Sequence, residues 1–261
     1  LVVANIYKST RMKKKDWIDL IMESAKILAE ILSVMASIGF IVGALSMTGM
    51  AQAFSSELVF FANGNALLML LMGALACFIL GFGMTVSAAY IFLAIVLVPA
   101  LETLGFVPMA VHMFVLYWGM LSYITPPVAL AALTASSMAG GKFMKTGWEA
   151  MKMGVVLYFL PFFFVYNPAL LLISDSVVEI VSVIITAVLG IIFLSASTQG
   201  YMPGIGKVDK SAKGYILRGV FFATGIMMMI PETITDIIGL AVTLVYLISV
   251  FVVRNKKRAE A

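Results

Sequence analysis

A long apolar stretch with almost no charge constrains this chain more than any other feature of its sequence. Between residues 58 and 141 the only acidic or basic side chains are Glu102 and His112. The chain of 261 residues is 62% hydrophobic and 11% charged, whereas soluble domains are about 45–50% apolar. Its apolar runs exceed the roughly 9–11 residues of a barrel strand and do not alternate. The sequence therefore predicts an all-α polytopic membrane protein.

Two interruptions break this stretch at positions expected to lie inside the membrane. Residues 81–85 read Gly-Phe-Gly-Met-Thr, and residues 122–127 read Ser-Tyr-Ile-Thr-Pro-Pro. Such residues release backbone amides and carbonyls from the helical ladder, which hydrocarbon tolerates only where protein or a water-filled cavity satisfies them. Secondary transporters build ion and substrate sites from broken helices. A proline kink and a glycine packing notch remain the alternative, because both residues are common in transmembrane helices.

Charge placement predicts how the chain is oriented. Residues 1–30 predict a basic cytoplasmic segment followed by an amphipathic interfacial helix, and residues 31–50 predict the first span. Residues 51–64 contain no Lys or Arg and predict an outer loop, whereas Lys142, Lys145 and Lys152 mark a later cytoplasmic connection. Residues 154–173, 177–194, 216–230 and 237–253 predict further spans. Residues 174–261 then form a C-terminal transmembrane extension.

Residues 65–98 predict a re-entrant helical hairpin with its tip at the first interruption. Its arms, residues 65–80 and 86–98, are short for membrane spans. If they were full spans, the connection between them would lie in the cytoplasm. That connection carries no charge, whereas every other predicted cytoplasmic connection is basic. Both arms are therefore expected to enter from outside, with residues 99–107 returning there. Residues 109–139 would measure about 46 Å as one helix, which favours a span broken at the second interruption. The region 31–173 thus carries the hairpin and the broken helix, and the chain has about six full spans in all.

The two interruptions also predict a cation site made of oxygen atoms. The intramembrane part of the apolar stretch has no carboxylate for a proton relay, and the chain shows no catalytic cluster. Hydroxyls and backbone carbonyls suit a hard cation such as Na⁺, and half-helices beginning at Ser87 and Pro126 would favour an anionic substrate. Alternatively, the hydroxyls bond to the preceding helical turn. His112 is expected to pack near the outer interface, with a proton or ligand role as the alternative.

Several motifs in order resemble the large permease subunit of the tripartite ATP-independent periplasmic (TRAP) transporters. They lie at residues 81–90, 98–101, 112–115, 124–132 and 164–172, and the likeness covers about residues 21–172. The sequence is most similar to the fused permeases of the TAXI branch. This resemblance implies that the chain is the second inverted repeat plus a C-terminal extension, without the first repeat and the small-subunit portion. One departure is Thr85-Val86, where relatives usually carry Pro-Thr.

The resemblance implies an elevator-type Na⁺ symporter of the bacterial inner membrane that is fed by a periplasmic binding protein. Its substrates would be organic acids such as dicarboxylates, 2-oxoacids, acidic amino acids or sugar acids, with Na⁺ as the coupling ion and no cofactor. An intramembrane enzyme and a non-transporting membrane scaffold remain alternatives. The predicted ion-binding residues are Gly81, Gly83, Ser122, Thr125 and Val128, and the predicted substrate region comprises Thr85, Ser87, Ala88, Pro126 and Pro127.

Overall fold

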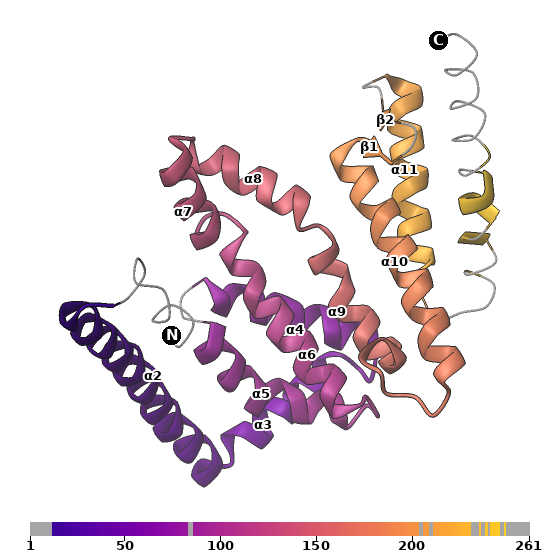
Figure 1. Ribbon diagram of the computed structural model, residues 1–261. Helices are drawn as coiled ribbons and strands as arrows, with labels where there is room; N and C mark the ends of the chain where they lie inside the picture. The colour runs from indigo at the N-terminus through magenta and orange to yellow at the C-terminus, as the bar shows by residue number, and fades with distance from the viewer. Residues whose placement is uncertain are drawn as a thin grey trace. The chain divides into compact units, whose positions relative to one another are not determined.

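Helices make up nearly all of the chain that the computed structural model describes (Figure 1). The described residues are 12–82, 86–203, 206–208 and 211–230, with 235, 238–239, 241–245 and 248. Two short strands, β1 (Tyr201–Met202) and β2 (Gly206–Lys207), pair antiparallel. The prediction of an all-α protein is confirmed at this level. The chain divides into two compact units, Leu1–Ala53 and Phe54–Ala261, which are described separately.

The first unit is dominated by one long helix, α2 (Lys14–Thr48). Its start is capped by Asp16, whose carboxylate accepts a 2.7 Å hydrogen bond from the Lys13 amide. The backbone stays helical through residue 30, where the interfacial helix was expected to pass into the first span. Charged and apolar residues here are both good helix formers, and the segment has no Gly or Pro before Gly39. A change in polarity alone therefore does not end the helix.

The predicted outer loop at residues 51–64 is wrong over most of its length. Helix α3 (Met50–Phe61) occupies it and ends where Asn63 and Gly64 adopt positive φ angles of 49° and 69°. The absence of Lys and Arg was used to predict which side of the membrane the segment faces, and it carried no information about its backbone. Because α3 contains no Gly or Pro, nothing in its sequence prevents a helix.

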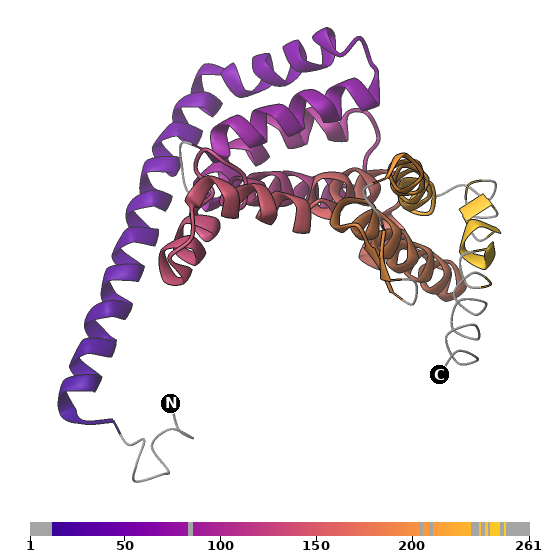
Figure 2. The ribbon, with the colours of Figure 1, turned by 90° about the horizontal axis from the view of Figure 1, so that it is seen from above.

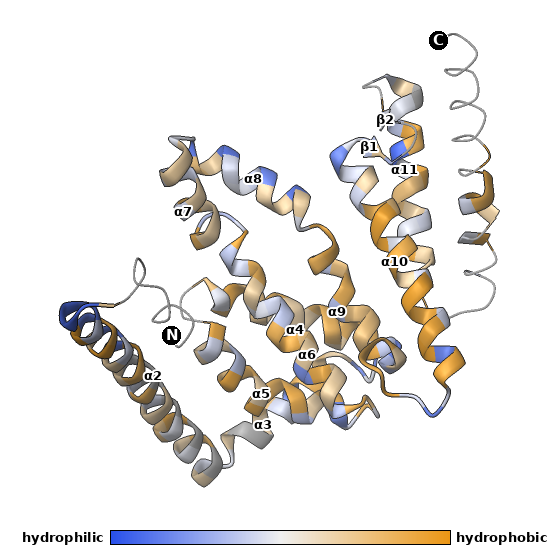
Figure 3. Ribbon diagram, viewed as in Figure 1, coloured by the Kyte–Doolittle hydropathy of each residue, from blue (hydrophilic) through white to orange (hydrophobic). Residues whose placement is uncertain are grey.

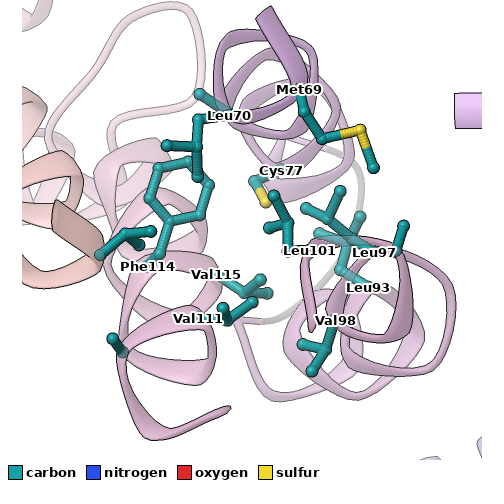
Figure 4. Packing of buried hydrophobic residues seen from close by; sticks show 14 of the residues in the cluster. Met69, Leu70, Cys77, Leu93, Leu97, Val98, Leu101, Val111, Phe114 and Val115 are labelled. Atoms are coloured by element: carbon teal, nitrogen blue, oxygen red, sulfur yellow. The ribbon is translucent and has the colours of Figure 1, made fainter. Parts of the chain in front are cut away.

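Helices α4 (Ala66–Gly81), α5 (Val86–Glu102) and α6 (Pro108–Met120) form the main core of the second unit. Asn65 caps α4 by accepting a 3.0 Å hydrogen bond from the Leu68 amide. Side chains from all three helices meet in one cluster, including Leu70, Leu97 and Phe114 (Figure 4). Helix α5 runs beyond the predicted end at residue 98, because Pro99 lies within its last turn and its carbonyl still accepts the Thr103 amide.

The chain after α6 is first interrupted, at the 3-10 turn η1 (Leu121–Tyr123) and before α7 (Leu130–Ala139), and then almost continuously helical through α8 (Phe143–Met153) and α9 (Val156–Tyr166). The expected span at residues 154–173 is replaced by α9 and the turn η2 (Pro168–Leu171). Residues 143–166 together are long and apolar enough to cross a membrane. Figure 3 shows the polar residues gathered on α8 and the apolar character of α9.

Helices α10 (Val177–Gln199) and α11 (Ala212–Met227) lie side by side (Figures 1 and 2). Helix α10 is also long and apolar enough to span a membrane. Large side chains on it are exposed, with Val177 at 73% and Val178 at 78%. Apolar side chains exposed along such a helix fit contact with lipid rather than water. The predicted span at residues 237–253 lies mostly outside the described residues.

Candidate functional site

The two interruptions predicted from the sequence lie next to each other. Helix α4 ends at Gly81, and α6 ends just before η1. A Cβ atom placed on Gly81 would lie 3.1 Å from the Gly119 carbonyl oxygen and 3.1 Å from both Cβ and Oγ of Ser122. Such distances are tighter than an ordinary side chain contact, so the absence of a side chain at Gly81 allows the approach. The end of the first hairpin arm is thereby packed against the broken helix.

The second interruption is held by hydrogen bonds within its own segment. Ser122 donates its hydroxyl proton to the Gly119 carbonyl at 2.9 Å, and Thr125 donates to the Leu121 carbonyl at 2.7 Å. The Ala129 amide donates to the carbonyls of Ser122 and Thr125, both at 3.1 Å. These bonds satisfy groups that the broken helix leaves without helical partners, as burial in a membrane requires.

A tight turn separates Thr125 from α7. The Pro126–Pro127 peptide bond is cis, and Ala129 has a φ of 38°, in the left-handed region. Helix α7 begins at Leu130, so the half-helix predicted to begin at Pro126 starts later. Its first residues instead form a turn, because two consecutive prolines supply no amide protons for a first helical turn and Pro127 restricts the residue before it.

Other helices hold the broken segment in place. A Cβ on Gly147 of α8 would lie 2.6 Å from Cγ of Pro126, so α8 packs directly on the double proline. From α9, the Tyr158 hydroxyl lies 2.6 Å from Oγ1 of Thr125. Trp118 of α6 contacts the Tyr158 ring edge to face, with centroids 6.1 Å apart. The Thr125 side chain is consequently buried, with 3% exposure.

Helix dipoles determine which charges the contact between Gly81 and Gly119 favours. The C-terminal ends of α4 and α6 meet at Gly81 and Gly119, and each end carries partial negative charge on its last carbonyls. The start of α5 is also close, since a Cβ on Gly119 would lie 3.9 Å from Cγ1 of Val86. Two helix C-termini favour a cation, and a neighbouring helix N-terminus favours an anion.

The structure brings together only part of the predicted site. Gly81 contacts Ser122, and Thr125 lies three residues beyond Ser122 in the same broken segment, with Ser122 and Thr125 both buried. Gly83 and Thr85 lie outside the described residues. Ser87 is exposed and Ala88 half-buried on the first turn of α5, and Pro127 is exposed while Pro126 and Val128 are half-buried.

Gly119 and Tyr158 were missed by sequence reasoning. Gly119 lies one turn before the interruption in an otherwise helical segment, which gives it no distinguishing pattern. Tyr158 lies on a different helix, 33 positions from Thr125, in an aromatic run that reads as ordinary lipid-facing sequence. The only available signal was that a buried tyrosine hydroxyl needs a hydrogen-bond partner.

Comparison with known protein families identifies the chain. Residues 1–180 match the model of the family described as tripartite ATP-independent periplasmic transporter, DctM component. The chain belongs to this family. It is therefore a membrane component of a TRAP-type transporter, as the resemblance predicted. The same comparisons found no significant match among curated proteins or among solved structures.

A polar pair in this TRAP permease joins the hairpin to α6 away from the interruptions. The Tyr90 hydroxyl of α5 lies 3.0 Å from Nδ1 of His112 on α6, and both side chains are half-buried. Their ring centroids are 5.9 Å apart. His112 therefore has a specific hydrogen-bonding partner on the neighbouring helix. Among the described residues, no group of three or more His, Cys, Asp or Glu side chains is arranged to hold a metal ion.

Proposed function

We propose that this chain is the permease component of a binding-protein-dependent secondary transporter that imports organic acids by Na⁺ symport. The single observation that carries the proposal is the contact between Gly81 at the end of α4 and the broken helix at Gly119 and Ser122. The permease would lie in the bacterial inner membrane as a multi-pass protein of the TAXI type. The hairpin would be re-entrant and would move with the substrate in an elevator mechanism.

The proposed Na⁺ site uses the oxygen atoms gathered at this contact. A backbone carbonyl has two lone pairs, so the Gly119 carbonyl can accept from Ser122 and still face a cation. Thr125 can act in the same way, since its hydroxyl keeps a lone pair after donating to Leu121. Discontinuous helices in transporters use unwound carbonyls and C-terminal helix ends for such ions.

The proposed substrate position is beside the ion, toward the helix N-termini. Helix α5 begins at Val86 and α7 at Leu130, and the N-terminus of a helix attracts negative charge. An organic carboxylate fits this field. Na⁺ bound at the carbonyls would add positive charge nearby, which gives a physical reason for the ion and the anion to bind together.

The experiment that tests the proposal is uptake by the natural full-length permease reconstituted in vesicles with its periplasmic binding protein. Uptake of a labelled organic acid should follow an imposed Na⁺ gradient. Thr125→Ala should raise the Na⁺ concentration for half-maximal uptake by about five- to a hundredfold, the equivalent of roughly 1–3 kcal/mol. Thr125→Ser keeps the hydroxyl and should largely preserve uptake.

Thr134→Ala is the matched control for this substitution. Thr134 lies on α7 and donates to the Leu130 carbonyl at 3.0 Å, which is the same type of bond that Thr125 makes to Leu121. Its removal should leave the Na⁺ dependence unchanged. Uptake that ignores Na⁺ and follows a proton gradient would refute the coupling ion, and His112 would become the residue to test.

The partner and the orientation are tested separately. Permease without the binding protein should show little uptake at micromolar substrate, and full activity from permease alone would refute the proposed dependence on a binding protein. After Cys77 is replaced, single cysteines at Ser56 and Glu102 should react with a membrane-impermeant thiol reagent from the periplasm. A cysteine at Lys145 should not react, and its labelling from outside would overturn the broken-span topology. All three positions are exposed.

A further inference from the structure

The hydroxyl group of Tyr158 reaches the second interruption from α9, a helix that no sequence pattern connects with it. Helix α9 places this hydroxyl 2.6 Å from Oγ1 of Thr125. Thr125 is 3% exposed, and the Tyr158 ring lies in edge-to-face contact with Trp118, centroids 6.1 Å apart. Aromatic packing therefore fixes where the Tyr158 hydroxyl lies, and that position is directly on Thr125.

The direction of this hydrogen bond follows from counting protons. A threonine hydroxyl has one proton and two lone pairs, and a carbonyl oxygen can only accept. Because Thr125 lies 2.7 Å from the Leu121 carbonyl, its proton is used there. Tyr158 is then the donor to Thr125. Thr125 is left with one lone pair and no free proton, so it can offer only an acceptor to whatever binds at the interruption.

We infer that Tyr158 is a positioning residue for cation binding, which fixes the Thr125 hydroxyl so that its remaining lone pair is presented to the ion. The inference rests on the proposed function. A cation requires a lone pair and is repelled by a hydroxyl proton pointing toward it. The Tyr158 donor and the Leu121 acceptor together fix the rotation of the Thr125 hydroxyl before the ion arrives, which lowers the ordering cost of binding. Tyr158 thus acts through Thr125 and need not touch the ion.

A double-substitution cycle with Tyr158→Phe and Thr125→Ala tests this inference in the full-length permease. Tyr158→Phe should raise the Na⁺ concentration for half-maximal uptake about three- to tenfold, the usual effect of one hydrogen bond. The maximal rate at saturating Na⁺ should stay within about twofold, because only the ion affinity is affected. In the Thr125→Ala background, Tyr158→Phe should add nothing, since the residue through which it acts is gone.

Tyr117→Phe is the matched control, since Tyr117 is a half-buried tyrosine of α6 whose ring packs on Phe164. It should leave the Na⁺ dependence unchanged. A second measurement needs no transport. Because Trp118 packs on Tyr158, its fluorescence should report Na⁺ titration once every other tryptophan of the protein, including Trp17 and Trp148, is replaced by Phe. The same three- to tenfold weakening is expected in Tyr158→Phe.

The outcomes distinguish failure of the proposed Na⁺ coupling from failure of the positioning role of Tyr158. If wild-type uptake and fluorescence both ignore Na⁺, the proposed function fails, and this inference fails with it. If the wild type responds to Na⁺ but Tyr158→Phe behaves like it, or if the two substitutions are additive, only the positioning role is overturned. A Tyr158→Phe protein that melts lower without Na⁺ and loses maximal rate instead of affinity would show a structural role and would also overturn the inference.

Discussion

Glycine serves different purposes in the α10–α11 pair and in the α4–α6 region. In the pair, a Cβ on Gly225 would lie 2.8 Å from the Leu194 amide nitrogen and 2.9 Å from the Gly190 carbonyl oxygen, so two continuous helices touch backbone to backbone. In the α4–α6 region, Gly81 brings the end of one helix against a broken segment, at 3.1 Å from the Gly119 carbonyl oxygen. The first contact joins two helices whose backbone groups are hydrogen-bonded within each helix. The second brings the end of α4 against the Gly119 carbonyl near the end of α6.

The difference shows what a close approach of backbones can accomplish in a membrane. Lipid gives helices no hydrophobic reason to associate, so small residues stabilise pairs by allowing van der Waals contact. That accounts for Gly190 and Gly225 completely. At Gly81 the same closeness places oxygen atoms together, and the broken segment needs its own hydrogen bonds from Ser122, Thr125 and Ala129 to remain stable. A site requires both the glycine and the break.

The largest effect on folding is expected for Gly225→Leu. Its side chain would meet backbone atoms of α10, which cannot move aside as a flexible side chain can. The two helices would have to separate, at a cost of about 3 kcal/mol in the free energy of unfolding. Thermal unfolding of the purified protein in detergent would measure this as a lower melting temperature and a smaller folded yield.

Gly219→Leu provides the control on the same helix. A Cβ at Gly219 has nothing within 4 Å, so the same substitution should leave the melting temperature nearly unchanged. Equal destabilisation by both substitutions would show that the loss of glycine from α11, rather than the contact with Gly190, matters. The statement that Gly225 stabilises the protein by allowing α10 and α11 to touch would then be refuted.

Gly81→Ala should affect transport more than stability. The new methyl group needs a shift of a few tenths of an ångström against Gly119 and Ser122, which should cost about 1 kcal/mol or less. That shift would still move the oxygen atoms of the proposed ion site, so the Na⁺ concentration for half-maximal uptake should rise about tenfold. Uptake and melting temperature should both be measured on the same preparation.

Gly73→Ala sharpens this comparison on the same helix, α4. The nearest atom to its methyl group would be the flexible end of Leu97, 2.7 Å away, inside the apolar core. It should lower the melting temperature at least as much as Gly81→Ala does, while the Na⁺ dependence stays at the wild-type value. Loss of Na⁺ affinity in Gly73→Ala would mean that general packing of the hairpin, and no special contact at Gly81, controls ion binding.

The smallest effect is expected for Tyr90→Phe, which removes the hydrogen bond to His112 between α5 and α6. Hydrogen bonds between helices in membranes are worth about 0.6 kcal/mol on average. Unfolding in a mixed detergent series should therefore show a small loss, with Tyr201→Phe on an exposed tyrosine as the control. A loss of several kcal/mol would show that the pair holds the hairpin in place and that the contact at Gly81 is secondary.

Local sequence signals predicted several element boundaries well. The arms expected at residues 65–80 and 86–98 correspond to α4 and the first part of α5, because Asn65 is a good helix cap and a Gly-x-Gly pair weakens a helix. The break expected within residues 109–139 is present between α6 and α7, because consecutive prolines cannot continue a helix. The loop expected at residues 51–64 was mistaken because it was assigned from charge, which does not determine the backbone.

Taken by itself, the sequence determined that this chain is a helical membrane protein and that its helices are interrupted at Gly81 and at the double proline, because composition and local backbone chemistry act over a few residues. Only the tertiary structure decided that Gly81 meets the broken helix, that the Gly119 carbonyl lies at this contact and that the Tyr158 hydroxyl reaches Thr125. Those contacts join positions on different helices. Their distances depend on how whole helices pack, and no pattern within one segment records that packing.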